Sequence, residues 1–250
     1  MFKGFIGALG FLSILPFGGR AAEKGLTRAA GFFPLAGFCI GVFLFLLDRL
    51  FLFLGFPALL SAALLVCALA FITGGMHLDG LADTADGLFS GKDKDGVLAV
   101  MRDPHTGALG TTAVVCALIL KTALLASLNG HFRPAALLFM CVLSRWSAVP
   151  AMALFPYART EGKAKVFIAS LRGRVLYSAS LQVLLFSLLL RGAEGVLFYA
   201  GVFLFTFLSG KFYLRKIGGI TGDTLGAQIE ISELFVLFSL CLAESRPLPV

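Results

Sequence analysis

The sequence predicts an all-α fold: a polytopic transmembrane helix bundle with six or seven spans, preceded by an N-terminal interfacial or re-entrant helix. Hydrophobic residues make up 58% of the 250 residues, and the mean hydropathy is +0.93. Charged residues make up 14%, whereas a soluble domain carries about 25%. Several apolar runs approach the roughly 20 residues that a helix needs to cross a bilayer. Residues 1–250 therefore predict a single integral-membrane domain.

Helices are the expected elements because a backbone exposed to lipid must satisfy its own hydrogen bonds. The stretch MFKGFIGALGFLSILPF (1–17) resembles a signal peptide, but no small-residue cleavage site follows, so we expect a retained helix. The spans are predicted at 32–54, 58–76, 107–127, 134–155, 175–191, 195–214 and 226–243. The last is the weakest, because its strictly apolar part has only about 13 residues.

Basic residues are unevenly divided between the two sides of the predicted membrane. Fourteen of the 21 lysines and arginines fall in one set of loops, 18–31, 77–106, 156–174 and 211–225. The opposite side holds Arg133, Arg191 and Arg246. Because lysine and arginine collect on the cytoplasmic side, the first set of loops is predicted to be cytoplasmic. The net charge of +7 then reflects membrane topology, and no nucleic-acid partner is expected.

An unusual acidic stretch, HLDGLADTADGL (77–88), follows the second apolar run. Asp79, Asp83 and Asp86 are spaced i, i+4, i+7, which places them within about 60° of arc on a helix. Three carboxylates on one stripe repel each other, and a charged residue within a membrane costs about 2.5–3.5 kcal/mol. A divalent cation resolves both problems, and oxygen ligands favour Mg²⁺ or Mn²⁺. The alternative is a solvated helix end with scattered acids.

Two further segments carry polar groups on the same predicted cytoplasmic face. In GKDKDGVLAVMRDPHTGALG (91–110), Arg102 is a candidate for bidentate phosphate binding, and Asp103 stands beside it. In GGITGDTLGAQIEISE (218–233), Glu230 and Glu233 share a helix face. Asp223 is either part of this second acidic group or a helix N-cap. The topology predicts that both acidic groups share one cavity.

Other polar residues lie close to or within the predicted spans. His77 is expected either to hydrogen-bond a ligand or to cap a helix. Lys121 and Arg145 lie inside apolar runs, where ionisable residues are functional candidates by default. Acids that hold a metal beside lysine and arginine are the groups that pyrophosphate chemistry requires. The residues alone therefore predict a membrane enzyme that uses Mg²⁺ on a pyrophosphate-type substrate at the cytoplasmic face.

Four motifs in order resemble a known family. HLDGLADTADGL, MRDPHTGALG, SRWSAVPAMALFPYAR (144–159) and GGITGDTLGA are similar to the adenosylcobinamide-GDP ribazoletransferases, or cobalamin synthases, over residues from about 30 to 240. The resemblance implies transfer of adenosylcobinamide-GDP to α-ribazole or its 5′-phosphate, with adenosylcobalamin or its 5′-phosphate and GMP as products. It also implies dependence on Mg²⁺ and a location in the bacterial cytoplasmic (inner) membrane, with the active site facing the cytoplasm. His105 and Thr106 depart from the family pattern after Arg-Asp-Pro.

The resemblance also suggests roles for individual residues. The expected metal ligands are Asp79, Asp83, Asp86, Asp223, Glu230 and Glu233. The expected phosphate or substrate contacts are Arg102, Lys121, Arg145 and Arg159. The expected catalytic groups are Asp86, Asp103 and His77. The partners implied are the two substrates and the lipid bilayer, with a homo-oligomer and other corrinoid-pathway enzymes as further candidates.

Three rival interpretations stay open from the sequence. A CDP-alcohol phosphotransferase requires DGxxAR, but Asp79-Gly80 is followed by Leu81-Ala82-Asp83. A prenyltransferase needs two widely separated aspartate-rich helices, whereas the second acidic group here is rich in glutamate. A cation or metabolite transporter would place its acids near the bilayer midplane, often in paired repeats, and no internal repeat is visible here.

Overall fold

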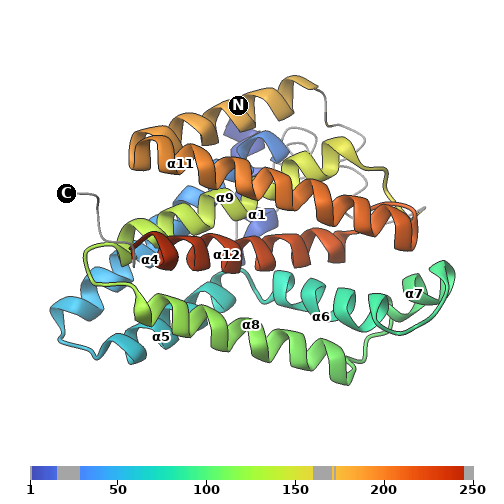
Figure 1. The fold of residues 1–250 in the computed structure, drawn as a ribbon, viewed down its shortest axis with the longest axis horizontal. Helices are drawn as coiled ribbons and strands as arrows, with labels where there is room; N and C mark the ends of the chain where they lie inside the picture. The colour runs from blue at the N-terminus through green and yellow to red at the C-terminus, as the bar shows by residue number, and fades with distance from the viewer. Residues whose placement is uncertain (1, 16–28, 160–170, 172, 245–250) are drawn as a thin grey trace.

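The computed structural model describes residues 2–15, 29–159, 171 and 173–244. In this part of the chain the regular elements are helices, with no strand, as predicted. They are α1 (Phe2–Leu12), the 3₁₀ helix η1 (Ala30–Phe32), α4 (Phe33–Phe53), α5 (Ala58–Ile72), α6 (Met76–Leu88), α7 (Lys94–Val100), α8 (Ala108–Ser127), α9 (Arg133–Leu154), α11 (Gly173–Ile217) and α12 (Gly222–Glu244). Figure 1 shows the long helices stacked side by side.

The polytopic bundle is confirmed. Five helical segments of the described chain are long and apolar enough to cross a membrane, and α5 with α6 makes a sixth if this bent pair is one span. Six spans agree with the predicted six or seven, and α11, which is one of these segments, contains both predicted spans 175–191 and 195–214. Its backbone breaks at Gly192 (φ 55°, ψ −136°), and the two parts fold back on each other (Figure 1).

Helix α9 forms the centre of the bundle. It packs against α4, α11 and α12, and 83% of its most apolar window is buried, compared with 22% for α8 and for α11. Within it, the Trp146 ring stacks on Tyr199 of α11 at 4.4 Å between centroids. Near its first turn, the Arg133 Nε atom donates to Asp48 of α4 at 2.7 Å. Helices α9 and α12 thus lie inside, while α8 and α11 present apolar surface outward.

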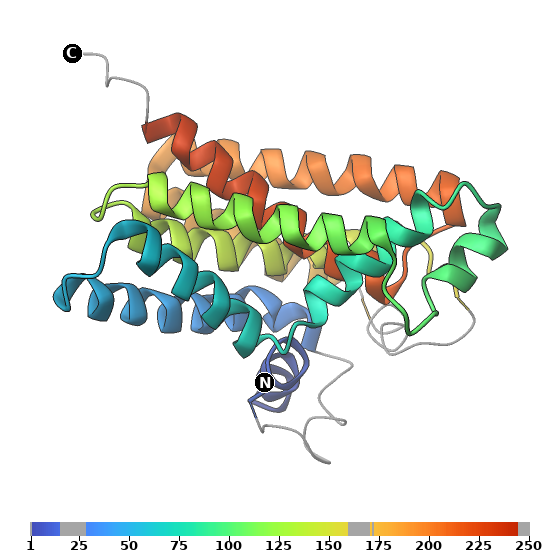
Figure 2. The same ribbon diagram turned by 90° about the horizontal axis from the view of Figure 1, so that it is seen from below.

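The acidic helix α6 is set across the end of α5 by a sharp turn. The two helices are bent by 88°, and between them Gly74 and Gly75 both have left-handed backbones (φ 63° and 68°), which glycine adopts without steric cost. The predicted span 58–76 therefore ends early, at Ile72. The Ile14 N–H, just after α1, donates to the Ile72 carbonyl at 2.8 Å. Helix α1 lies at an angle to the long helices (Figure 2).

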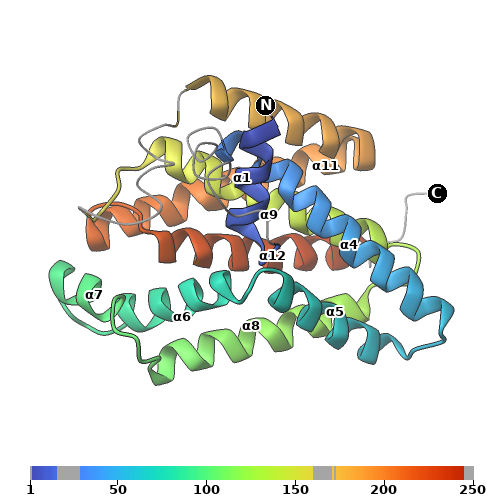
Figure 3. The same cartoon turned by 180° about the vertical axis from the view of Figure 1, so that it is seen from behind.

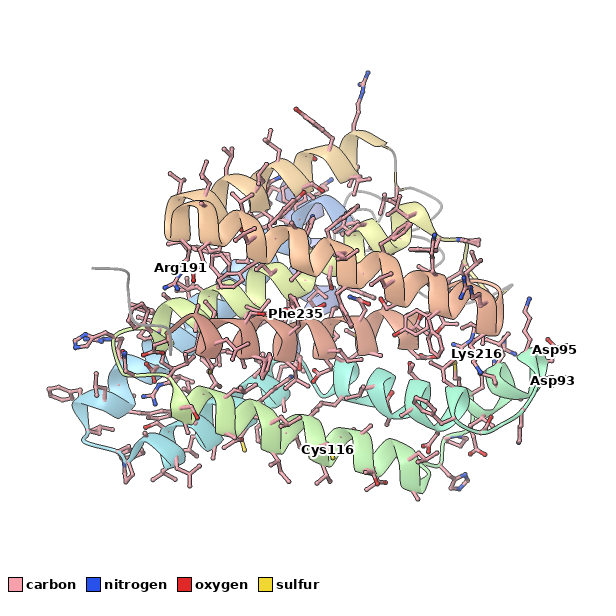
Figure 4. All side chains as sticks on the ribbon, viewed as in Figure 1. Asp93, Asp95, Cys116, Arg191, Lys216 and Phe235 are labelled. Atoms are coloured by element: carbon pink, nitrogen blue, oxygen red, sulfur yellow. The ribbon has the colours of Figure 1, made fainter. Side chains whose placement is uncertain are left out.

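The two acidic segments lie at the same end of the bundle, as the predicted topology requires. Helices α6 and α7 extend beside the turn between α11 and α12, and the view from behind shows the same arrangement (Figures 1 and 3). Figure 4 places Asp93, Asp95 and Lys216 at this end and Arg191 at the other. The placement of Lys216 and Arg191 at opposite ends agrees with their predicted assignment to opposite sides of the membrane.

Candidate active site

The site is built where α6 crosses the start of α12 with almost no space between the backbones. A Cβ atom on Gly80 would lie 2.8 Å from the Asp223 carbonyl oxygen, and one on Gly226 would lie 3.3 Å from the His77 carbonyl oxygen. Gly80 therefore requires glycine, and a side chain at Gly226 would require its neighbours to shift. His77 faces Gly226 and Gly80 faces Asp223, so the two helices run in opposite directions along the contact. This crossing brings the aspartates of α6 next to the first turn of α12.

An acid cluster results, defined here as Asp79, Asp83 and Asp223 with Arg159. Asp83 is within electrostatic range of the negative charges of Asp79 and Asp223. Asp79 is exposed, and the other two aspartates are partly buried. One arginine, Arg159, pairs with Asp223 at 2.6 Å. Negative charge therefore exceeds positive charge in this cluster.

Arg159 reaches the cluster because its segment is fixed to the start of α12. Tyr157 and Ile220 form an isolated parallel bridge. The Ala158 N–H donates to the Ile220 carbonyl, and the Ile220 N–H donates to the Pro156 carbonyl, both at 2.8 Å. Partial burial raises the pKa of the Tyr157 hydroxyl, which therefore stays protonated at neutral pH.

Thr221, rather than Asp223, caps helix α12. The Thr224 N–H donates to the Thr221 hydroxyl at 3.2 Å, and the Thr221 N–H donates to the Thr224 hydroxyl at 2.8 Å. The N-cap alternative for Asp223 is therefore wrong, and its carboxylate is available to Arg159 and to the cavity.

Asp86 lies on the same stripe but has a different set of contacts. Its two carboxylate oxygens accept hydrogen bonds from the backbone N–H groups of Gly107 (2.6 Å) and Gly110 (2.8 Å). A side-chain carbon on either glycine would overlap this carboxylate. Asp86 thus caps α8 from a distant part of the chain, where a negative charge is stabilised by the helix dipole. Its predicted metal and catalytic roles stay predictions, and this contact favours a positioning role.

Asp103 and Arg102 lie in the exposed loop before α8. The Asp103 carboxylate accepts a hydrogen bond from the His105 N–H at 2.9 Å and contacts the His105 ring at 2.8 Å. These contacts hold the pKa of Asp103 below its usual value. Arg102 is exposed beside it. The structure therefore places Asp103 with His105 instead of joining it to the acid cluster.

Glu230 and Glu233 are enclosed in the bundle with two basic residues. Lys121 of α8 pairs with Glu230 at 2.6 Å and with Glu233, and Arg145 of α9 pairs with the other oxygen of Glu233. All four side chains are at most 4% exposed. This set, called here the buried ion cluster, has equal numbers of positive and negative groups and connects α8, α9 and α12. The predicted metal roles of Glu230 and Glu233 and the predicted phosphate roles of Lys121 and Arg145 stay predictions, and these contacts favour a structural role.

Two cavities meet at Asp79. A cavity of about 270 Å³ lies between α1, α4, α6, α9 and α12, and its lining includes Phe33, His77, Asp79, Met152 and Arg159. A wider groove of about 690 Å³ runs between α6 and α8 and is also lined by Asp79. The aromatic wall of the first cavity was not predicted, because its residues come from α1 and α4, which are far from the acidic motifs in the sequence.

The donor set of the acid cluster suits a hard cation. No three histidine, cysteine, aspartate or glutamate side chains converge to form a complete metal cage in the described residues. Mg²⁺ does not need such a cage, because proteins commonly hold it with one or two carboxylates, water and substrate phosphates. Asp79 and Asp83, with their excess negative charge, fit that mode of binding.

The fold and site together define a polytopic helical membrane protein with an acid cluster beside a cavity. The chain matches the cobalamin-5-phosphate synthase family over residues 4–241, and it belongs to that family. It is 37% identical to an adenosylcobinamide-GDP ribazoletransferase of Roseiflexus sp. (strain RS-1), over 94% of this chain and 88% of the relative. It is 37% identical to one of Geotalea daltonii, over 98% of this chain and all of the relative. No solved structure matches the chain.

Proposed function

We propose that this protein is a Mg²⁺-dependent adenosylcobinamide-GDP ribazoletransferase of the bacterial inner membrane. It joins adenosylcobinamide-GDP to α-ribazole or its 5′-phosphate and releases GMP. The names of its full-length relatives support this reaction. The structural observation that carries the proposal is the acid cluster at the border of the two cavities, with Asp79 in both walls. The family match favours this reaction over the phosphotransferase, prenyltransferase and transporter interpretations.

Asp79 and Asp83 are the residues that would hold Mg²⁺. Bound there, the ion supplies positive charge to the pyrophosphate and to the departing GMP. Arg159, which already contacts Asp223 at 2.6 Å, is placed to bind a substrate phosphate, since a guanidinium matches phosphate oxygens in geometry and charge. When the substrate enters, Arg159 therefore exchanges the Asp223 carboxylate for a substrate phosphate.

The reaction requires one bond to form, one to break and one proton to be accepted. The ribazole 3′-hydroxyl oxygen bonds to the phosphorus attached to cobinamide, and the bond from that phosphorus to GMP breaks. The hydroxyl proton passes to a carboxylate. Asp86 and Asp103 each engage other groups of the chain, so Asp223, which lines the smaller cavity, is the better placed acceptor.

The active site faces the cytoplasm in this proposal. The end of the bundle that carries the acid cluster also carries α7, which begins at Lys94, and the last turns of α11, which hold Lys211, Arg215 and Lys216. Lysine and arginine near the ends of spans mark the cytoplasmic side. Adenosylcobinamide-GDP and α-ribazole 5′-phosphate carry charged phosphate groups, and in this proposal they reach the site from that side.

The decisive experiment measures GMP release and cobalamin formation by the protein purified in lipid. Adenosylcobinamide-GDP and α-ribazole 5′-phosphate are supplied with Mg²⁺ or with a chelator. We expect GMP and cobalamin product in equal amounts, and no turnover without the ion. Asp95→Asn is the matched control, because Asp95 is an exposed aspartate on α7, outside the cluster. Equal turnover with and without the ion would reject the Mg²⁺ assignment, and absence of product would reject the reaction.

A further inference from the structure

The 270 Å³ cavity has an apolar section to which four helices contribute. Phe11 of α1 and Phe33 of α4 stack with their rings 5.9 Å apart and 9° from parallel, and both line the cavity. Ala148 of α9 and Ile229 of α12 line it as well. Such a surface suits a flat aromatic group, because leaving water and contacting other rings both make its free energy of binding more favourable.

One polar side chain stands beside this apolar section without a hydrogen bond. His77 lines the cavity and is 2% exposed. Neither of its ring nitrogens has a hydrogen-bond partner among the described residues. Buried polar atoms are almost always hydrogen-bonded. The ring lies within electrostatic range of Arg145, Glu233 and Lys121 but forms no hydrogen bond to them, so its nitrogens are left for a molecule in the cavity.

The opposite end of the same cavity is charged. Because α6 and α12 run in opposite directions, His77 lies beside Gly226, while Asp79, next to Gly80, lies near Asp223. Arg159 and Asp223 line this second end. A ligand that fits both ends has an aromatic group with one hydrogen-bonding atom, attached to a polar and anionic part.

We propose that this cavity binds the ribazole substrate, with its dimethylbenzimidazole base in the apolar section and its ribose toward Asp79 and Arg159. The inference rests on the proposed function and adds the location of one substrate. The base has a single free ring nitrogen, which accepts a hydrogen bond from His77. Its methyl groups contact Phe33 and Ala148. The ribose hydroxyl then points to the acid cluster, where the pyrophosphate is bound.

The other substrate, adenosylcobinamide-GDP, fits this cavity poorly, whether through its corrin ring or through its guanine. A corrin ring with its adenosyl ligand is far larger than 270 Å³, since pockets for drug-sized ligands already measure about 300–1,000 Å³. Guanine is small enough, but its edge carries several donors and acceptors. Outside the acid cluster, the polar side chains of the described lining are His77 and Tyr157, so most of these groups would be buried without partners, which is strongly unfavourable.

The test compares the kinetics of both substrates in three variants of the protein purified in lipid. Ala148→Leu narrows the apolar section, His77→Leu removes the hydrogen bond, and His77→Gln retains a donor. We expect Ala148→Leu and His77→Leu to raise the KM for α-ribazole about tenfold or more, with the KM for adenosylcobinamide-GDP changed less than about twofold. His77→Gln should recover part of the loss. Ala153→Leu, an exposed position on the same helix, is the matched control.

A second measurement separates this inference from the proposed function. Binding of α-ribazole to each variant is measured by calorimetry, without turnover, and thermal unfolding confirms that each variant is folded. Ala148→Leu should weaken the binding of α-ribazole more than it weakens the binding of an analogue whose base lacks both methyl groups. Equal losses for the two compounds, or a changed KM for the corrinoid substrate alone, would overturn the inference even if the wild type makes cobalamin. A wild type that binds α-ribazole but makes no product would instead contradict the proposed reaction.

Discussion

The acid cluster and the buried ion cluster both take residues from α12, yet they are arranged in opposite ways. In the buried ion cluster, two glutamates meet one lysine and one arginine, and all are at most 4% exposed. In the acid cluster, three aspartates meet one arginine beside a cavity. Compensated charge in a dry interior favours a structural role, whereas uncompensated charge beside a cavity favours the proposed binding of a cation. The comparison teaches that charge balance, more than residue type, distinguishes the two clusters.

The largest expected effect comes from removing the shared acid of the buried ion cluster. Glu233→Leu leaves Lys121 with one partner and removes the carboxylate that Arg145 contacts. Breaking a buried pair in this way costs about 3–5 kcal/mol, so we expect poor yield and a lower unfolding temperature. Glu194→Ala serves as the control, since its pair with Arg191 is partly exposed. A Glu233→Leu protein that is stable but inactive would indicate that Glu233 has a catalytic role.

The complementary change in the acid cluster should affect turnover more than stability. Asp83→Asn relieves repulsion from Asp79 and Asp223 and removes a candidate Mg²⁺ ligand. We expect activity to fall about 100-fold or more, with an unfolding temperature equal to or above that of the wild type. Steady-state rates over a Mg²⁺ titration, together with thermal unfolding in lipid, measure both. Full activity with unchanged Mg²⁺ dependence would show that Asp83 does not hold the ion.

A smaller effect is expected where Asp86 caps α8. Asp86→Ala leaves the N–H groups of Gly107 and Gly110 without their carboxylate and should lower the free energy of unfolding by about 0.5–2 kcal/mol. Asp86→Asn keeps one accepting oxygen and should retain most of the stability and activity. Chemical denaturation measures the first effect and GMP release the second. If Asp86→Asn were as inactive as Asp83→Asn, Asp86 would belong to the acid cluster after all.

The smallest effect is expected outside both clusters, at His105. The backbone N–H and the ring of His105 lower the pKa of Asp103 below its usual value. A lowered pKa stabilises the folded protein above the unfolded-state pKa, and this stabilisation is lost as the pH falls through the folded-state pKa. Asp103 is exposed and His105→Ala removes only the ring contact, so the unfolding temperature at neutral pH should stay nearly unchanged. An NMR titration of the Asp103 carboxyl carbon should show a partial rise of its pKa, and no rise would reject the ring contact.

The sequence predicted the bundle, the stripe of aspartates and the shared end of the two acidic segments, because hydropathy and helical period are local properties. It did not predict which opposite charges pair, since this depends on the register between distant helices. Lys121 and Arg145, isolated cations in apolar runs, did require counter-ions, and Glu230 and Glu233 were acids in a comparable setting. The contact between Asp86 and Gly110 left no such signal, because a backbone donor is invisible in a sequence.

The shortness of α5 has a consequence for the membrane itself. At about 1.5 Å per residue, its 15 residues extend over about 22 Å, less than the roughly 30 Å of a bilayer's hydrocarbon core. After the Gly74–Gly75 turn, α6 therefore starts below the level of the lipid headgroups, unless the bilayer thins to meet it. The rate of turnover should then depend on the thickness of the bilayer. We expect lipids with longer acyl chains to slow turnover, and a rate independent of chain length would contradict this.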